Sequence, residues 1–200
     1  MLQGQEAALG PDHPRTLTTL NVLAEYQLAR RADAAAEPML RRLLDSHVAN
    51  DGEDHEVTCA SRQKLAACLE RLGRPAETEP LFRHEAARLT LRHGASHEWT
   101  LGAIAHLSSS LMTQARNAEA LELLRPALET ATAALGEDAE VTWRLAAVTA
   151  GCLDDVGRKD EAAALAERVL PRMRAALGPT HEGVAHVEKL LSDLRGGGRR

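Results

Sequence analysis

Four histidines recur at one place in a repeated loop, and histidine is the commonest protein ligand for transition metals. They are His13, His55, His97 and His181, each three residues after a glycine. Zinc requires donor nitrogens about 2 Å from the ion, whereas equivalent residues of stacked repeats are at least about 8–10 Å apart. Ala139 also interrupts the series. We therefore expect this loop to be a structural turn, and the chain to hold no metal or cofactor.

A second candidate for chemistry is His106 with Ser109, which stands in a run of three serines. A spacing of three residues lets two side chains face each other on a helix. Ser109 could then be a nucleophile with His106 as its base, or both could contact a ligand. In the simpler interpretation, Ser108 fills a small packing position and Ser109 is solvated. Because no acidic residue is placed to orient His106, we favour an interpretation without catalysis.

The acidic pair Asp154 and Asp155 could contact a divalent cation. Calcium and magnesium need about six oxygen ligands or more, so two carboxylates indicate a solvated helix end instead. The sequence also contains no phosphate-binding loop, dinucleotide-binding glycine pattern, G-x-S-x-G or H-E-x-x-H motif. We therefore expect a protein that is not an enzyme.

The composition is that of an ordinary soluble chain, with 200 residues, a formal net charge of −5 and 26% charged residues. This balance argues against nucleic acid as a partner, and no apolar run approaches the ~20 residues of a membrane span. The N-terminus lacks a basic-then-apolar export signal, and the three cysteines form no C-x-x-C pair. We expect a cytoplasmic protein with reduced thiols, and the excess of arginine over lysine suggests a bacterial source.

An internal repeat sets the elements that must position these residues. Glycines at 10, 52, 94, 136 and 178 mark five copies of one pattern, with an unvarying step of 42 residues. Two positions after each glycine comes a residue of the N-cap type, namely Asp12, Asp54, Ser96, Asp138 and Thr180. Leucine and alanine dominate while β-branched and aromatic residues are scarce, which favours helices over strands.

Each repeat is expected to contain two helices. The first runs some 16 residues and ends at a shared position, which Gly73 and Gly157 occupy in two repeats and Arg31 and Ala115 in the others. A second amphipathic stretch follows, with apolar residues at helical spacing. Because neither helix can bury its apolar stripe alone, stacked hairpins would build a continuous core.

The pattern resembles the tetratricopeptide repeat in its 42-residue, kinesin-light-chain-like form, which reads roughly G-x-x-H-P-x-T-L-x-x-L-x-N-L-A and then G-R-x-x-E-A. The matching segments are GPDHPRTLTTLNVLA at 10–24, GRPAETEPLFR at 73–83 and GRKDEAAALAERVL at 157–170. The resemblance implies an all-α fold, a right-handed α-solenoid of stacked helix hairpins (a TPR-like superhelix). It rests on packing and capping residues, so it is informative about the fold and less so about function.

We expect a single TPR-like repeat domain over residues 1–195. Its full repeats would span 10–51, 52–93, 94–135 and 136–177, followed by a closing helix at 182–195 and a disordered tail at 196–200. Residues 1–9 resemble the end of a preceding second helix and would leave apolar surface uncovered. We therefore expect either a weak homodimer or a longer parent chain.

In the family, the first helices line a concave groove in which peptides lie, and the resemblance transfers this role by position. The polar residues expected to contact a partner are Asn21, Glu25, Lys64, Arg71, His106, Ser109, Arg144 and Asp155. Carried over in the same way, the face also includes Thr18, Val22, Leu28, Ala29, Ala60, Gln63, Ala67, Glu70, Gly102, Ala105, Met112, Thr113, Ala147, Val148, Gly151, Asp154, His186 and Lys189.

We therefore predict a non-catalytic protein- or peptide-binding scaffold or sensor module that uses this groove. Two alternatives stay open. One is a small-molecule-binding or catalytic accessory protein with a groove pocket around His106, Ser109 and Arg144. The other is an assembly subunit that self-associates through its open ends. The sequence does not identify the partner.

Overall fold

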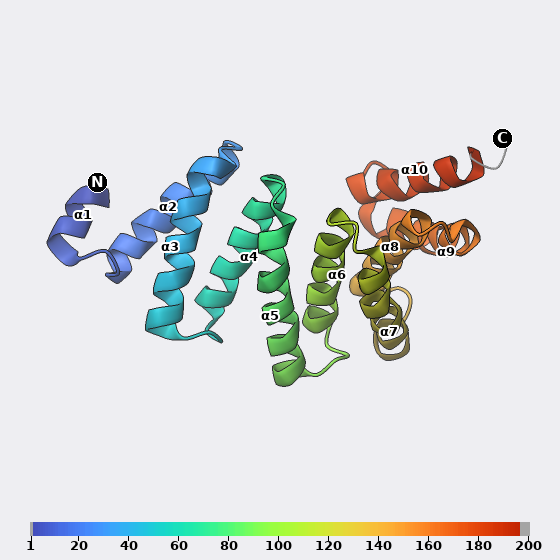
Figure 1. The fold of residues 1–200 in the computed structure, drawn as a ribbon, viewed down its shortest axis with the longest axis horizontal. Coiled ribbons are helices and arrows are strands. Elements are labelled where there is room, and N and C mark those ends of the chain that lie inside the picture. The colour runs from blue at the N-terminus through green and yellow to red at the C-terminus, as the bar shows by residue number, and fades with distance from the viewer. Residues whose placement is uncertain (1, 197–200) are drawn as a thin grey trace. The chain divides into compact units, whose positions relative to one another are not determined.

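The computed structural model describes residues 2–196, which form helices joined by short connections and contain no strand (Figure 1). They fall into two compact units, one ending at Leu81 and one beginning at Phe82. The first unit contains α1 (Leu2–Leu9), α2 (Pro14–Ala29), α3 (Asp33–Asp51), α4 (Glu56–Arg71) and the start of α5 (Pro75–His93). The second contains the rest of α5, then α6 (Glu98–Thr113), α7 (Asn117–Leu135), α8 (Glu140–Asp155), α9 (Lys159–Leu177) and α10 (Glu182–Gly196). The expected all-α fold is confirmed.

The helices repeat with the period of the sequence. The first helices α2, α4, α6 and α8 each have 16 residues, and the second helices α3, α5, α7 and α9 each have 19. The expected closing helix corresponds to α10, which ends one residue later, at Gly196. The rest of the predicted disordered tail, residues 197–200, lies outside the described residues.

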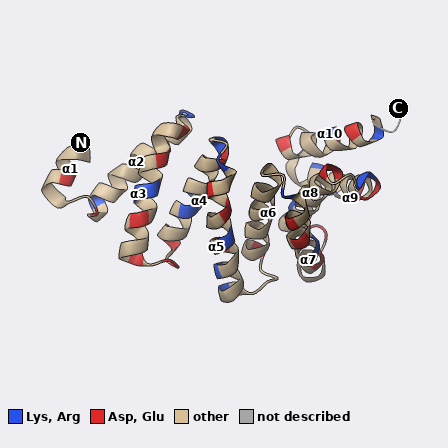
Figure 2. Ribbon diagram, in the orientation of Figure 1, with Lys and Arg blue, Asp and Glu red and all other residues tan. Residues whose placement is uncertain are grey.

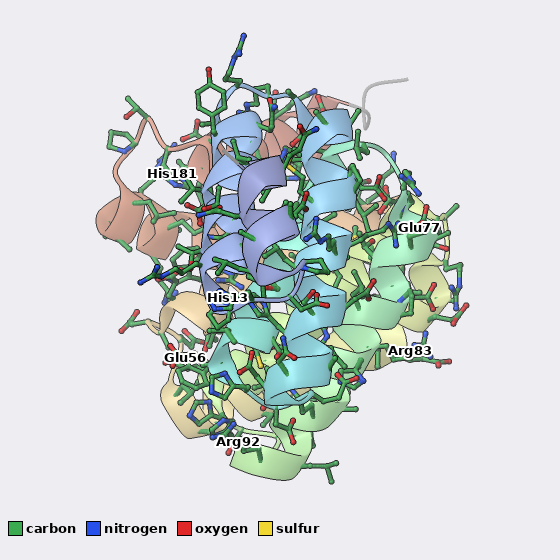
Figure 3. All side chains as sticks on the ribbon, turned by 90° about the vertical axis from the view of Figure 1, so that its left-hand side faces the viewer. His13, Glu56, Glu77, Arg83, Arg92 and His181 are labelled. Atoms are coloured by element: carbon green, nitrogen blue, oxygen red, sulfur yellow. The ribbon has the colours of Figure 1, made fainter. Side chains whose placement is uncertain are left out.

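The repeated histidines cap the first helices. Nδ1 of His13 accepts a hydrogen bond from a backbone N–H two residues further on, at 3.2 Å, and His55 and His97 do the same at 3.4 and 3.3 Å. His181 accepts the equivalent bond ahead of α10 at 3.1 Å. Figure 3 labels His13 and His181 in the connections that precede α2 and α10. These bonds satisfy backbone donors that a helix start leaves unpaired.

The sequence predicted N-caps two positions after each repeat glycine, as at Asp12. This prediction is wrong by one residue, because the caps are the histidines that follow. Asp12 instead accepts a hydrogen bond from the hydroxyl of Ser46 on α3 at 2.6 Å. Asp138 likewise accepts from Arg172 on α9 at 3.1 Å. Because these aspartates accept hydrogen bonds from the second helix of their own repeat, they are not available to cap the first helix.

A threonine closes the three capped loops ahead of α2, α4 and α6. The hydroxyl of Thr16 donates to the carbonyl oxygen of Gly10 at 2.9 Å, and Thr58 and Thr100 make the same bond six residues back. The repeat that contains α8 departs from this scheme, since Ala139 offers no side-chain cap and the buried hydroxyl of Thr142 has no partner among the described residues.

The shared break between the two helices of a repeat is left-handed. Gly73 and Gly157 have φ values of 68° and 79°, and Arg31 and Ala115 adopt 58° at the same position. The sequence-based assignment of this break is thus confirmed. A residue with a Cβ pays roughly 1–2 kcal/mol for this conformation, so Arg31 and Ala115 are strained where the glycines are not.

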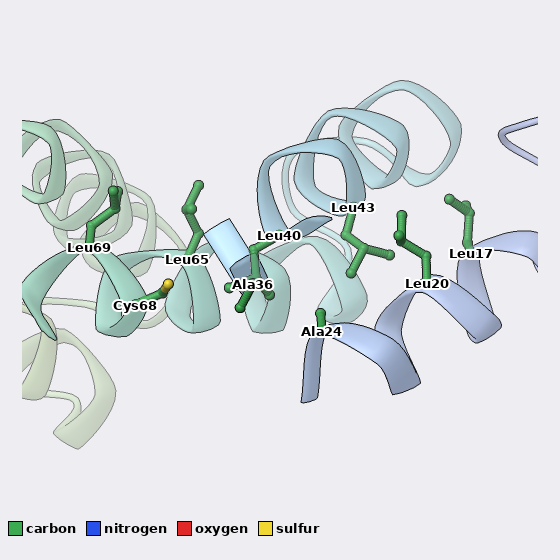
Figure 4. Packing of buried hydrophobic residues seen from close by; sticks show 9 residues of the cluster. All are labelled: Leu17, Leu20, Ala24, Ala36, Leu40, Leu43, Leu65, Cys68 and Leu69. Atoms are coloured by element: carbon green, nitrogen blue, oxygen red, sulfur yellow. The ribbon is translucent and has the colours of Figure 1, made fainter. Parts of the chain in front are cut away.

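Each unit has a core of its own. In the first, the core consists of Leu17, Leu20 and Ala24 of α2, Ala36, Leu40 and Leu43 of α3, and Leu65, Cys68 and Leu69 of α4 (Figure 4). In the second, a cluster of buried residues from α8, α9 and α10 includes Trp143, Met173 and Val187. Each cluster draws on three successive helices, as stacking of hairpins requires.

Arginine–glutamate ion pairs link the middle of one second helix to the start of the next. Glu77 pairs with Arg41 at 2.5 Å, and Glu161 pairs with Arg125 at 3.3 Å; each pair spans 36 residues. Each glutamate also pairs with an arginine three residues before it, Arg74 or Arg158. The side chains are about half exposed, so each link contributes little to stability. The two links lie 84 residues apart, which is two periods of the repeat.

Candidate functional site

An open cleft of about 350 Å³ lies in the second unit among the first helices α6, α8 and α10. It is lined by Ser109, Met112, Thr113, Ala147, Val148, Gly151, Asp155 and His186. All eight positions belong to the face that the resemblance implied for partner binding. The lining surface is more apolar than polar, with polar groups from Ser109, Thr113, Asp155 and His186, which is the usual character of a ligand site.

Small residues make the cleft. At Gly151 a Cβ would lie 3.7 Å from Cε of Met112, so the methionine tip rests over a position that has no side chain. Glycine inside a helix costs about 1 kcal/mol relative to alanine. Gly102 in α6 is also a glycine inside a helix, and a Cβ there would lie 3.5 Å from the guanidinium of Arg144. Two glycines within helices on one face are therefore a cost in stability that folding alone does not explain.

The cleft lining contains one carboxylate, that of Asp155 at the C-terminal end of α8. Both α6 and α8 lack a basic residue in the last turn, and α8 ends on Asp154 and Asp155. Negative charge at a helix C-terminus opposes the helix dipole. Within the described chain, neither carboxylate has a hydrogen bond or ion pair. Beyond Glu98, α6 carries no lysine, arginine, aspartate or glutamate and is almost entirely tan in Figure 2.

The charge of Asp155 also affects a neighbouring thiol. Burial raises the pKa of Cys152 to about 11, and the negative charge of Asp155 adds to that effect. The Cys152 thiol donates to the carbonyl oxygen of Asn117 at 3.3 Å, as Cys68 does to Asp33 two repeats earlier. Both thiols are buried and serve to tie a first helix to the preceding second helix.

His106 and Ser109 do not form a nucleophile–base pair. The His106 ring stacks on Phe82, with ring centroids 5.3 Å apart, and the Ser109 hydroxyl donates to the carbonyl of Ala105 at 3.0 Å. The stacked ring is partly shielded from water, which lowers the pKa of His106, and the positive charge of Arg144 lowers it further. Of the alternative pocket around His106, Ser109 and Arg144, the cleft contains Ser109 but neither of the other two.

In the first unit, three predicted site residues bind one another. The Lys64 ammonium lies 2.5 Å from a carboxylate oxygen of Glu25 and donates to the side-chain oxygen of Asn21 at 3.0 Å. Asn21 also donates to Glu25 at 3.1 Å. The bond from Lys64 is the main cause that lowers the pKa of Glu25. This network joins α2 to α4 and uses much of the capacity that these groups would have for a partner.

Arg71 is also engaged within the first unit. Its guanidinium lies 2.7 Å from Asp33 at the start of α3, so it ties the end of α4 to the neighbouring helix. A histidine–serine contact that the sequence did not indicate joins His47 of α3 to Ser61 of α4 at 2.8 Å. Ser61 is buried, and this contact also serves to hold helices together.

Residues 100–138 and 153–182 match the family model of the tetratricopeptide repeat. Over these two segments the chain is similar to tetratricopeptide repeats. Two crystal structures of kinesin light chain-like, nearly identical TPR-like repeats from Podosopora anserina cover 94% of this chain at 20% identity. Their TM-scores are 0.74 and 0.71, with 89% and 90% of those chains covered. The crystal structure of BtubC (BKLC) from P. vanneervenii covers 97% of this chain and 80% of its own, with 15% identity and a TM-score of 0.65. These likenesses show a shared fold, and no curated protein matches the sequence.

The helices place the predicted contact residues in different settings. Ser109 and Asp155 line the cleft, whereas Asn21, Glu25, Lys64 and Arg71 bond within the first unit. The polar set predicted from the sequence did not include the apolar wall of the cleft. The residues of this apolar wall were predicted only as positions on the partner-binding face of the first helices. None of the described helices combines the length and hydropathy of a membrane-spanning segment.

Proposed function

We propose that this tetratricopeptide-repeat chain is a non-catalytic scaffold that binds a protein or peptide partner on the face formed by its first helices. The observation that carries the proposal is the open, largely apolar cleft among α6, α8 and α10. Its volume of about 350 Å³ is at the lower end of the usual range for ligand sites, about 300–1,000 Å³. A space of this size suits one or two side chains of a docked peptide.

The remaining chemistry supports binding rather than catalysis. A catalytic serine needs a base within hydrogen-bond reach, and Ser109 bonds to its own helix instead. The buried thiols of Cys68 and Cys152 are poor nucleophiles because burial raises both pKa values. The free cysteines support a reducing setting such as a cytoplasm, and the excess of arginine over lysine suggests a bacterial source. The net charge of −5 argues against nucleic acid as the partner.

The proposal is tested by selecting binders from a random twelve-residue peptide library displayed on phage. Selected peptides are synthesised with a fluorescent label, and their affinity is measured by anisotropy. Gly151→Leu, which fills the cleft, should weaken binding by about tenfold or more. Glu167→Ala, on the second helix α9, is the control and should change affinity by less than about twofold.

The opposite pattern would refute the proposal. If the selected peptides bind Gly151→Leu as tightly as the wild type while Glu167→Ala abolishes binding, the partner surface lies on the second helices. Thermal melts of both variants establish that each is folded.

A further inference from the structure

The charge at the end of the cleft is the opposite of what helix stability favours. Lysine, arginine and histidine are the residues that stabilise the last turn of a helix. The last turns of α6 and α8 contain none, and α8 ends on two aspartates without a bonding partner in the described residues. Asp155 lines the cleft, whereas Asp154 does not. Helix stability does not explain an acidic group at this position, which also lines an apolar cleft.

His186 of α10 lines the same cleft as Asp155, and the other nearby basic side chains of residues 82–196 are placed or paired elsewhere. Arg158, three residues further on, pairs with Glu161 at 2.5 Å. Arg144 stands near the other end of α8, with Glu140 at 3.7 Å. Lys189 of α10 is exposed and is not part of the cleft lining. The carboxylate of Asp155 is therefore available to a positive charge supplied from outside.

The apolar part of the cleft lining determines which side chain of the ligand would lie beside its positive charge. Met112, Ala147 and Val148 provide an apolar wall, and Gly151 leaves room above it. An aliphatic side chain that enters this space is removed from water, which is favourable. A neighbouring cation would then meet Asp155 beside a surface from which the ligand has displaced water, and the lower local dielectric strengthens the attraction.

We propose that the cleft binds a peptide segment in which an aliphatic residue is adjacent to a lysine or arginine. The aliphatic side chain packs against Met112 and Val148, and the cation pairs with Asp155. This inference rests on the proposed function and adds the chemistry of the partner. Electrostatic complementarity of this kind gives specificity more than raw affinity.

The test uses the same random twelve-residue phage library, selected separately on the wild type, Asp155→Asn and Asp154→Asn, followed by sequencing. The wild type should enrich lysine or arginine next to an aliphatic residue at least threefold over the input library. Asp155→Asn should lose this enrichment. Asp154→Asn is the matched control, because it removes the same charge from the same helix end but not from the cleft, and it should keep the enrichment.

The outcomes separate the two proposals. Peptides that require the open cleft, as judged by Gly151→Leu, but show no basic preference would overturn this inference and leave the proposed function standing. Peptides indifferent to Gly151→Leu would overturn the proposed function. Loss of the preference in Asp154→Asn as well would overturn the assignment to Asp155, because the preference would then come from general charge. If free arginine amide competes as strongly as a selected peptide, the site takes a small cation and the peptide proposal is wrong.

Discussion

Replacing Gly151 with alanine should make the protein more stable and a poorer binder. In α8, glycine costs about 0.8–1.0 kcal/mol relative to alanine. The added Cβ would meet Met112 Cε at 3.7 Å, an ordinary contact distance, so no strain subtracts from the gain. For a chain of 200 residues, about 1 kcal/mol corresponds to a rise in Tm of about 2–4 °C. The measurement is thermal unfolding followed by circular dichroism, beside peptide affinity by anisotropy.

Gly102→Ala supplies the matched control. It makes the same change inside α6, where the Cβ would lie 3.5 Å from the flexible end of Arg144, but Gly102 does not line the cleft. Both variants should therefore gain stability, and only Gly151→Ala should lose peptide affinity. A Tm for Gly151→Ala that is equal to or below that of the wild type would refute the reasoning, since the glycine would then be needed for packing rather than for the cleft.

Two further predictions concern strain and protonation. Ala115→Gly should stabilise the protein by about 0.5–1 kcal/mol, because relief of the left-handed strain, roughly 1–2 kcal/mol, exceeds the entropic cost of glycine in the unfolded chain. The free energy of unfolding is measured in urea. A loss of stability instead of a gain would mean that Ala115 is not strained. Because the pKa of His106 is lowered in the folded state, the unfolded chain binds its proton first, so stability should fall as pH drops through about 6.5 and below. His106→Gln should reduce this slope in pH-dependent unfolding, and an unchanged slope would show that other groups cause it.

The fold could be predicted because every repeat carries the same local signals. A fixed step between glycines, apolar residues at helical spacing and a left-handed break at Gly73 and Gly157 are enough to locate the hairpins. The N-cap was misplaced because aspartate is locally a better cap than histidine. Its hydrogen bond to the second helix, as in Asp12 to Ser46, is visible only when the hairpin is formed.

The candidate site was less predictable for a different reason. Lys64 and Arg71 looked available for a partner because their counterions, Glu25 and Asp33, lie 39 and 38 residues earlier in the chain. The cleft depends on missing side chains, above all at Gly151, and on three helices that stand close enough to line one open space. A pattern of residue types in one helix reports neither property.

Because the step is always 42 residues, each repeat is a segment that can be lost or duplicated as a whole. The glycine, its histidine cap and the closing threonine bond lie within one period, and each arginine–glutamate link reaches forward by the same 36 residues. Loss or duplication of a whole period would therefore rejoin compatible connections, and the chain could change length in helix pairs without new capping chemistry. The cleft would not be preserved by every such loss or duplication. The residues equivalent to Gly151 and Asp155 one repeat earlier are Ser109 and Thr113, so recombination that preserves the fold could still erase the acidic end of the site.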